Sequence, residues 1–240
     1  HHNYCGVLMK RKFAFTLAEV LITLGIIGVV AAMTMPSIIN IYKQKVFNNQ
    51  FRKVYNTLSN AHVSAKYEWG TNPLCYYNTG GLDSPDFNDC NAFSQIFLKQ
   101  LNIAKSCGSD AMQKGCIPRY KGIDEIKKEN NPDMGDDEIL ESITGCTNMT
   151  YSTLKKYTAY ILQDGTIIMP AVGNGNERIA VNTIVDINGM KGPNKWGHDV
   201  FYFYIYFDGK KYILNNSGGC MPLEKGGRYV SQMINYVNSH

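Results

Sequence analysis

An apolar run close to the N-terminus constrains the fold of this chain more than any other feature. Residues Phe15–Met35 form a stretch of 21 residues with a single charged side chain. This is the length that a helix needs to cross the hydrocarbon core of a bilayer. Lys10, Arg11 and Lys12 precede the run, and such basic residues hold their side of a membrane helix in the cytoplasm. We therefore predict one membrane helix, with the rest of the chain exported.

A secretory signal peptide is the alternative interpretation of the same run. It would need a cleavage site of small residues after the apolar part, for which Ala31-Ala32-Met33 could serve. Glu19 argues against it, because a carboxylate inside an apolar run costs on the order of several kcal/mol unless it finds a partner. Gly25, Gly28 and Pro36 also weaken the helix. A lone anchor does not need these features, so they indicate a function in the membrane.

The residues around the start of the run carry a specific resemblance. The segment Lys12–Glu19 reads KFAFTLAE and resembles the cleavage-and-methylation segment of type IV prepilins and type II secretion pseudopilins. The resemblance implies that a prepilin peptidase cuts between Ala14 and Phe15 and methylates the new amine of Phe15. Glu19 then matches the glutamate at the fifth mature position of the family, and Pro36 matches its helix-kinking proline. Ala14 departs from the glycine that is usual there, which predicts slower cleavage.

The resemblance also implies a division of the chain. Residues 1–14 would be a leader, residues 15–67 the N-terminal helix with 15–35 in the membrane, and residues 70–240 the exported head. Met9–Ala14 resembles a complete short leader, so we expect residues 1–8 to come from upstream of the true start or from added sequence. Loss of the leader removes three basic residues and lowers the formal charge from +4 to about +1. A charge this small does not indicate nucleic-acid binding.

Cysteine usage agrees with an exported head. The chain has seven cysteines and no Cys-x-x-Cys, which argues against a zinc ribbon or a thioredoxin-type site. Cys5 lies in the leader, and the other six follow the apolar run, as is typical of a disulfide framework. Six free buried thiols are the alternative. Short separation favours the first two of the expected pairs, and the third follows by elimination. The expected pairs are Cys75 with Cys90, Cys107 with Cys116, and Cys146 with Cys220.

Helical periodicity continues beyond Pro36. Apolar residues recur at helical spacing between basic residues, so we expect the long helix to reach about Tyr67 and to end before Gly70. A helix lying on the membrane surface is the alternative. A short helix capped by Asp89 is predicted next, with an apolar face. Its apolar residues are Phe93, Ile96, Phe97 and Leu101. Lys121–Ser142 is polar and predicts a solvated face or a mobile loop, broken at Asn130-Asn131-Pro132.

Alternating patterns predict strands in the C-terminal part of the chain. Asp164-Gly165 and Asp208-Gly209 are hairpin signals. The expected strands are 157–162, 166–169, 179–187, 200–207 and 212–214. The run VFYFYIYF within residues 200–207 is apolar on both faces, which predicts a strand covered on both sides. We therefore predict an α+β, pilin-like fold: a long N-terminal helix packed on an antiparallel sheet, with a disulfide-rich αβ region.

One stretch of the predicted head could bind a metal ion. It contains four oxygen-bearing side chains on a loop with three glycines, a composition suited to Ca²⁺. These side chains are Asp186, Asn188, Asn194 and Asp199. The loop resembles the Asp-x-Asn-Gly loop of many pilin-like heads and, loosely, the calcium loop of major pseudopilins. No glutamate closes it as in an EF-hand, and Met190 lies where an acid would help. A metal-free turn held by Asx hydrogen bonds is the alternative, and no other cofactor is expected.

The sequence contains no signature of catalysis. Gly-x-Ser-x-Gly, His-Glu-x-x-His and P-loop motifs are absent. Gly173-Asn-Gly175 lacks the third glycine of a dinucleotide loop and predicts a turn. His62 and His198 could only act with a free cysteine, whereas the cysteines are expected to be paired. We therefore expect a structural filament subunit rather than an enzyme.

The resemblance also implies partners and a location. The partners would be identical or related pilin subunits, the prepilin peptidase, an inner-membrane assembly platform and membrane lipid. The subunit would cross the inner membrane once, with its head outside the cytoplasm, before joining a periplasmic or cell-surface filament. A minor pseudopilin of a secretion or DNA-uptake machine is the alternative within the family. A monomeric, membrane-anchored extracytoplasmic binding protein is the alternative outside it, and such a protein would not need Glu19.

Overall fold

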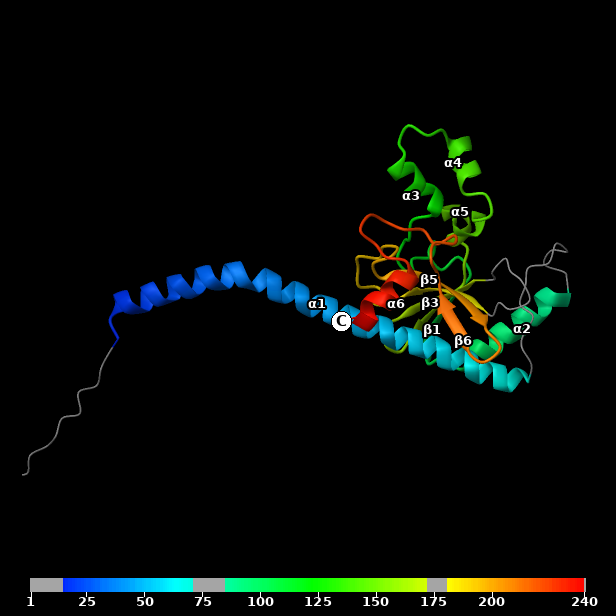
Figure 1. The fold of residues 1–240 in the computed structure, drawn as a ribbon, viewed down its shortest axis with the longest axis horizontal. Helices are drawn as coiled ribbons and strands as arrows, with labels where there is room; N and C mark the ends of the chain where they lie inside the picture. Colours follow the sequence, from blue (N-terminus) through cyan, green and yellow to red (C-terminus); the bar gives the residue numbers. More distant parts are fainter. Residues whose placement is uncertain (1–14, 71–84, 172–180, 240) are drawn as a thin grey trace, which may run out of the picture. The chain divides into compact units, whose positions relative to one another are not determined.

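The computed structural model describes residues 15–70, 85–171 and 181–239. They fall into two compact units, His1–Val46 and Phe47–His240, which are described separately. Helix α1 (Leu17–Trp69) begins in the first unit and ends in the second (Figure 1). The predicted end of this helix at about Tyr67 lies within two residues of the observed one.

The first unit consists, in its described part, of the N-terminal half of α1. Its side chains from Phe15 to Val46 are almost all exposed, although most of them are apolar. By length and composition α1 can cross a membrane, because an 18-residue window reaches a mean hydropathy of 2.2 with none of it buried. Pro36 lies inside the helix. A segment that is apolar on all sides needs a bilayer or other helices around it.

The second unit is built on a six-stranded antiparallel sheet whose strands follow chain order. The strands are β1 (Ile103–Gly108), β2 (Ala159–Leu162), β3 (Ile167–Ala171), β4 (Asn182–Asp186), β5 (Val200–Phe207) and β6 (Tyr212–Asn215). Gly165 and Gly209 lie in the predicted hairpin turns with positive φ angles of 89° and 99°, a conformation that favours glycine. Strand β5 pairs with β4 on one side and β6 on the other. The prediction that it is covered on both faces is confirmed, since Phe201, Tyr202 and Phe203 are all fully buried.

The C-terminal half of α1 packs on one face of this sheet. Phe51, Leu58 and Ala65 are buried on it, and the Phe51 ring lies 5.2 Å from the ring of Phe201 and 5.9 Å from that of Phe203. The observed arrangement is therefore the predicted α+β fold, with a long N-terminal helix on an antiparallel sheet.

Six shorter helical elements belong to the described part of the second unit. They are α2 (Pro85–Lys99), α3 (Ile123–Asn130), α4 (Asp136–Ser142), the 3₁₀ turn η1 (Thr147–Met149), α5 (Tyr151–Leu154) and α6 (Val230–Ser239). The apolar face predicted for α2 is confirmed, because Phe93 and Phe97 are buried. The helix starts at Pro85, so Asp89 lies inside it rather than at its cap. Proline is well suited to the first position of a helix.

For Lys121–Ser142 the predicted solvated face is confirmed, because most of its side chains are exposed or half-buried, whereas the alternative of a mobile loop was wrong. This polar segment forms two helices, α3 and α4, separated near the expected break at Asn130-Asn131-Pro132. The first turn of each helix contains a glutamate that accepts a hydrogen bond from the backbone N–H three residues earlier, Glu125 from Gly122 and Glu138 from Gly135. Each also buries one isoleucine, Ile126 or Ile139. Local capping and a single apolar anchor are therefore enough to hold these short helices on the head.

Candidate functional site

The beginning of α1 is fixed by a reciprocal cap between Thr16 and Glu19. The Thr16 backbone N–H and hydroxyl both donate to Glu19 Oε2 at 2.8 Å. The Glu19 backbone N–H donates in return to Thr16 Oγ1 at 3.2 Å. This capping box satisfies two N–H groups that a helix start would otherwise leave open. The sequence analysis missed it, although Thr-x-x-Glu before an apolar run is its usual signal.

Of the two residues that flank the predicted cleavage site, only Phe15 lies in the described part of the chain. Ala14 lies outside the described residues, whereas Phe15 lies just before α1 and is 85% exposed. Glu19 is one helical turn away from Phe15. Its Oε2 is occupied by Thr16, and its Oε1 accepts no hydrogen bond within the described part of the chain. The glutamate thus caps its own helix and keeps one oxygen free for a donor.

The apolar half of α1 contains two glycines at which another helix could pack closely. An added Cβ at Gly25 or Gly28 would meet nothing within 4 Å. The hydroxyls of Thr23 and Thr34 bond back to the carbonyls of Glu19 and Val30, at 2.9 Å each. Polar groups on this surface are therefore satisfied within the helix, and the two glycines leave room for a neighbouring backbone.

The four residues predicted to bind calcium meet in the β4–β5 connection. Asp186 ends β4, and its Oδ1 accepts hydrogen bonds from the backbone N–H groups of Asn188 and Gly189 at 3.2 and 2.8 Å. Its Oδ2 accepts the Tyr120 hydroxyl at 2.9 Å. Burial, and after it the charge of the nearby Asp199 carboxylate, raises the pKa of Asp186 to about 7.

Asp199 closes the other end of the same loop. Its Oδ2 accepts the backbone N–H of Asn194 at 2.8 Å and its Oδ1 that of Lys195 at 2.7 Å. Burial raises the pKa of this carboxyl as well. With its amide nitrogen turned inward, the Asn194 side chain donates to Asp186 Oδ2 at 3.1 Å. Both carboxylates thus accept N–H or O–H donors, which are the bonds of the metal-free alternative. Calcium binding stays a prediction.

No other candidate metal centre appears in the described ranges. They contain no group of three or more histidine, cysteine, aspartate or glutamate side chains that could hold an ion. His62 is buried, its Nδ1 lies 2.7 Å from the Leu58 carbonyl oxygen, and burial lowers its pKa to about 4. The His198 Nε2 lies 3.1 Å from the Lys225 carbonyl oxygen. These positions give the two histidines structural roles.

Disulfides hold the head at two of the three expected places. Cys107 is bonded to Cys116, and Cys146 to Cys220, with Cα atoms 5.9 and 4.9 Å apart. The expected pair Cys75–Cys90 lies outside the part of the chain whose side chains the structure describes, as does Cys5. The Cys146–Cys220 bond ties the segment after α4 to the segment after β6.

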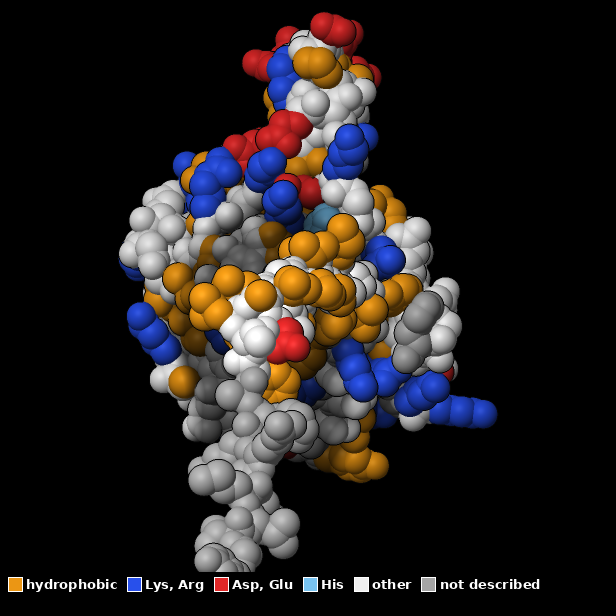
Figure 2. Space-filling model, turned by 90° about the vertical axis from the view of Figure 1, so that its left-hand side faces the viewer, with side chains coloured by type: hydrophobic (Ala, Val, Ile, Leu, Met, Phe, Trp, Pro, Cys, Tyr) orange, Lys and Arg blue, Asp and Glu red, His pale blue; other side chains and the backbone are white. Residues whose placement is uncertain are grey.

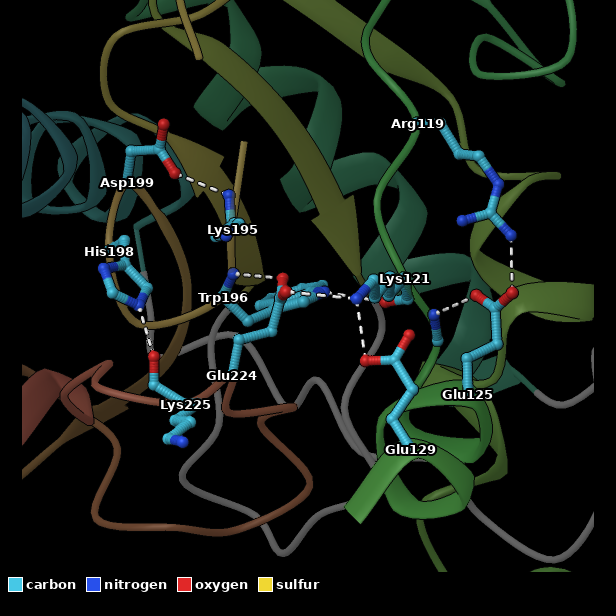
Figure 3. A network of polar contacts seen from close by, with 11 residues as sticks. Arg119, Lys121, Glu125, Glu129, Lys195, Trp196, His198, Asp199, Glu224 and Lys225 are labelled. Atoms are coloured by element: carbon cyan, nitrogen blue, oxygen red, sulfur yellow. Dashed lines mark hydrogen bonds and ion pairs between the residues drawn. The ribbon is translucent and has the colours of Figure 1, made fainter. Parts of the chain in front are cut away.

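A polar network attaches α3 to the loops around Trp196 (Figure 3). Lys121 forms ion pairs with Glu129 at 2.7 Å and with Glu224 at 3.5 Å. The Trp196 indole N–H donates to the Lys121 carbonyl oxygen at 2.7 Å, and the Trp196 backbone N–H donates to Glu224 at 3.2 Å. The residues of this network hold loops together, and none presents a nucleophile beside a base.

Comparison with known proteins finds one family match, at the N-terminus. Residues 9–35 match the family described as the prokaryotic N-terminal methylation motif. No curated protein and no solved structure matches the chain. The matched residues contain the predicted cleavage position, the Thr16–Glu19 cap and the start of the apolar helix. This motif, followed by the long apolar helix and the antiparallel head, fits a type IV pilin-like protein.

Proposed function

We propose that the protein is a structural subunit of a type IV pilus-like or type II secretion-like filament. In this proposal a prepilin peptidase cuts the Ala14–Phe15 bond and methylates the new amine of Phe15. The methylation motif at residues 9–35 carries the proposal, because it is the substrate signature of such a peptidase. The same motif indicates a structural protein rather than an enzyme.

Cleavage creates a charged amine next to the membrane helix, and that amine needs a partner. The free Oε1 of Glu19 in a neighbouring subunit can accept it, while Oε2 stays on Thr16. A charge-assisted hydrogen bond of this kind is strongest away from water. Each of the two groups alone is costly inside the membrane. The pair therefore favours association of the apolar helices over isolated anchors.

The exposed side chains of α1 support the same assembly. Leu21, Ile26 and Val29 are among many large apolar residues that have no partner within the described chain. Before assembly, lipid would surround them, and the head would lie outside the cytoplasm. In the filament, neighbouring helices would replace the lipid, with Gly25 and Gly28 as points of close approach.

Variants of Glu19 test this function and separate its two roles. Glu19→Ala loses both the cap and the charge, Glu19→Gln keeps the capping geometry without the charge, and Thr16→Ala weakens the cap but keeps the charge. We expect filaments in sheared surface fractions from the wild type and from Thr16→Ala, and none from either Glu19 variant. Electron microscopy and immunoblotting measure the yield, and membrane insertion should be unchanged in all four.

Two outcomes would contradict the proposal. Normal filaments from Glu19→Gln would show that the charge on Glu19 is not needed for assembly. A wild-type protein that is processed and inserted but never recovered as a filament would favour the monomeric, membrane-anchored binding protein. Glu68→Gln is the matched control, since Glu68 is an exposed acid on the same helix, near its other end.

A further inference from the structure

The charge of the chain is divided unevenly between one small lobe and the rest. Residues 122–144, which contain α3 and α4 and are called the acidic lobe below, hold eight of the 20 acidic side chains and only two of the 24 lysines and arginines. Figure 2 shows acidic side chains gathered at the top of the view, where α3 and α4 lie in Figure 1. A concentration of one sign on a chain that is otherwise basic points to a partner of the opposite sign.

Part of this acidity has a structural use at the base of the lobe. Asp124 Oδ1 accepts the backbone N–H of Tyr151 at 2.9 Å. Glu125 forms an ion pair with Arg119, and Glu129 with Lys121. The Cys146–Cys220 disulfide follows the end of α4 directly. These bonds attach the acidic lobe to the head, so its outer surface is presented in a defined orientation.

Asp136 forms an ion pair with Lys128 at 3.4 Å, whereas two further acids of α4 lie beside an exposed leucine. Asp137, Leu140 and Glu141 are spaced to lie on one face of α4. All three are exposed, and the carboxylates of the two acids have no ion pair or hydrogen bond within the described residues. Leu140 is 55% exposed, and few other large apolar side chains of the described head are exposed. These are Val63, Tyr67 and Met190.

The exposed leucine lies at the edge of a groove between α3 and α4. The groove has a volume of about 540 Å³ and a mostly apolar lining that includes Pro132, Ile139 and Leu140. Four acids and one lysine also line it: Asp124, Glu125, Glu129, Asp136 and Lys128. An apolar groove with acids around it suits a helix that offers apolar side chains flanked by lysines.

The chain itself contains a segment of that chemistry. Between Glu19 and Glu68, α1 has five basic residues and no acid. Arg52 and Lys53 already bond within the head, to the Val237 carbonyl and to Asp164. Lys43 and Lys45 are exposed and have no such bond within the described residues. Tyr42 and Val46 beside them are 67% and 37% exposed.

We propose that the acidic lobe of one subunit docks on the Tyr42–Val46 stretch of α1 in a second copy of the chain. Leu140 contacts Tyr42 and Val46, and Asp137 and Glu141 pair with Lys43 and Lys45. The inference rests on the proposed function, because assembly through α1 brings the head of one subunit beside the helix of another. Charge pairs at such a rim determine which surfaces meet more than how tightly they bind. The contact between the head of one subunit and α1 of the next is thereby directed to one register.

A charge exchange in the full-length protein tests the docking. Asp137→Lys with Glu141→Lys reverses the lobe, and Lys43→Glu with Lys45→Glu reverses the helix. Each pair alone is expected to lower the yield of sheared filaments, on the order of tenfold, and all four changes together to restore it. Lys210→Glu with Lys211→Glu in the exposed β5–β6 turn is the matched control and should leave the yield unchanged. An unchanged yield from the lobe reversal, or no rescue in the fourfold variant, overturns the docking.

A photo-reactive amino acid in place of Leu140 gives a second measurement that does not require filaments. In membranes of producing cells we expect a covalent dimer whose cross-linked peptide contains residues 42–46. A cross-link to a different protein, or to lipid alone, overturns the proposal of a second copy. The filament assay separates the two hypotheses. Wild-type filaments that tolerate the lobe reversal contradict the docking alone, whereas absence of filaments with the covalent dimer present contradicts the filament function alone.

Discussion

The two halves of α1 have the same backbone conformation and opposite surroundings. From Leu17 to Val46 its apolar side chains are exposed all around, whereas from Phe51 to Ala65 one face is buried against the sheet. The first half satisfies its polar groups within the helix and depends on lipid or other subunits for its apolar ones. The second half is stabilised by its own head. One continuous helix can therefore expose an apolar surface without a partner at one end and form part of a packed hydrophobic core at the other.

The strongest test of this difference compares one apolar residue from each half. Phe51→Ala should destabilise the head by about 3–5 kcal/mol, because it leaves a cavity between the rings of Phe201 and Phe203. Ile22→Ala should leave the head unchanged, since Ile22 is exposed in the first unit. Urea unfolding of the detergent-solubilised chain, followed by the fluorescence of Trp69 and Trp196, measures both. Equal effects would mean that the two halves do not differ as described.

Within the head, the two disulfides should differ in their contributions. Cys146–Cys220 closes a loop of 74 residues and Cys107–Cys116 a loop of nine. Since a longer loop loses more entropy when closed in the unfolded chain, the double serine variants should lose about 4 and about 3 kcal/mol respectively. Thermal unfolding of the head measures the order. Loss of the Cys107–Cys116 disulfide alone should leave the acidic lobe resistant to protease. A larger loss of stability from the Cys107–Cys116 variant than from the Cys146–Cys220 variant would contradict the entropic explanation.

Two buried groups in the head should produce opposite pH dependences. The folded pKa of Asp186 is raised to about 7, so its contribution to stability falls as pH rises between about 4 and 7. The folded pKa of His62 is lowered to about 4, so its contribution rises with pH between about 4 and 6.5. As pH rises from 5 to 8, the free energy of unfolding of Asp186→Asn should therefore increase relative to that of the wild type, on the order of 1–2 kcal/mol. Urea unfolding at several pH values checks this, and a parallel pH profile would contradict the assigned pKa of Asp186.

Calcium should have the smallest effect on the head. If the sequence-based prediction is correct, millimolar Ca²⁺ binds near Asp186 and Asp199 and raises the melting temperature by about 1–2 °C relative to chelator. The carboxylate oxygens already accept backbone N–H groups, which limits the gain. Asp199→Asn should abolish the difference. An unchanged melting temperature in the wild type would leave only the Asx turn.

The sequence predicted the features that depend on local signals. The anchor followed from one long apolar run, the hairpins from Asp164-Gly165 and Asp208-Gly209, and two disulfides were among the expected pairs. These signals act within a few residues or, for the disulfides, follow from the limited number of cysteines. Tertiary context is not needed to recognise them.

Among the elements that the sequence did not reveal, β1 depends on contacts with a distant part of the chain. Strand β1 is an edge strand in which no residue is buried, so it shows no alternating pattern, and its pairing with β2 is what makes it a strand. Helices α3 and α4 bury only Ile126 and Ile139 in a highly charged segment. The apolar stripe Val230–Met233–Val237 of α6 could have been found from its helical spacing.

The identity of the mature N-terminus tests the central claim most directly. The full chain would be produced with and without an active prepilin peptidase, extracted from membranes, and examined by intact mass and N-terminal peptide mapping. With the peptidase, the protein should begin at N-methylated Phe15, and Ala14→Gly should increase the processed fraction. Without the peptidase, residues up to Ala14 should remain attached. A mature protein that begins near Met33, or a chain that the peptidase leaves uncut, would contradict the account.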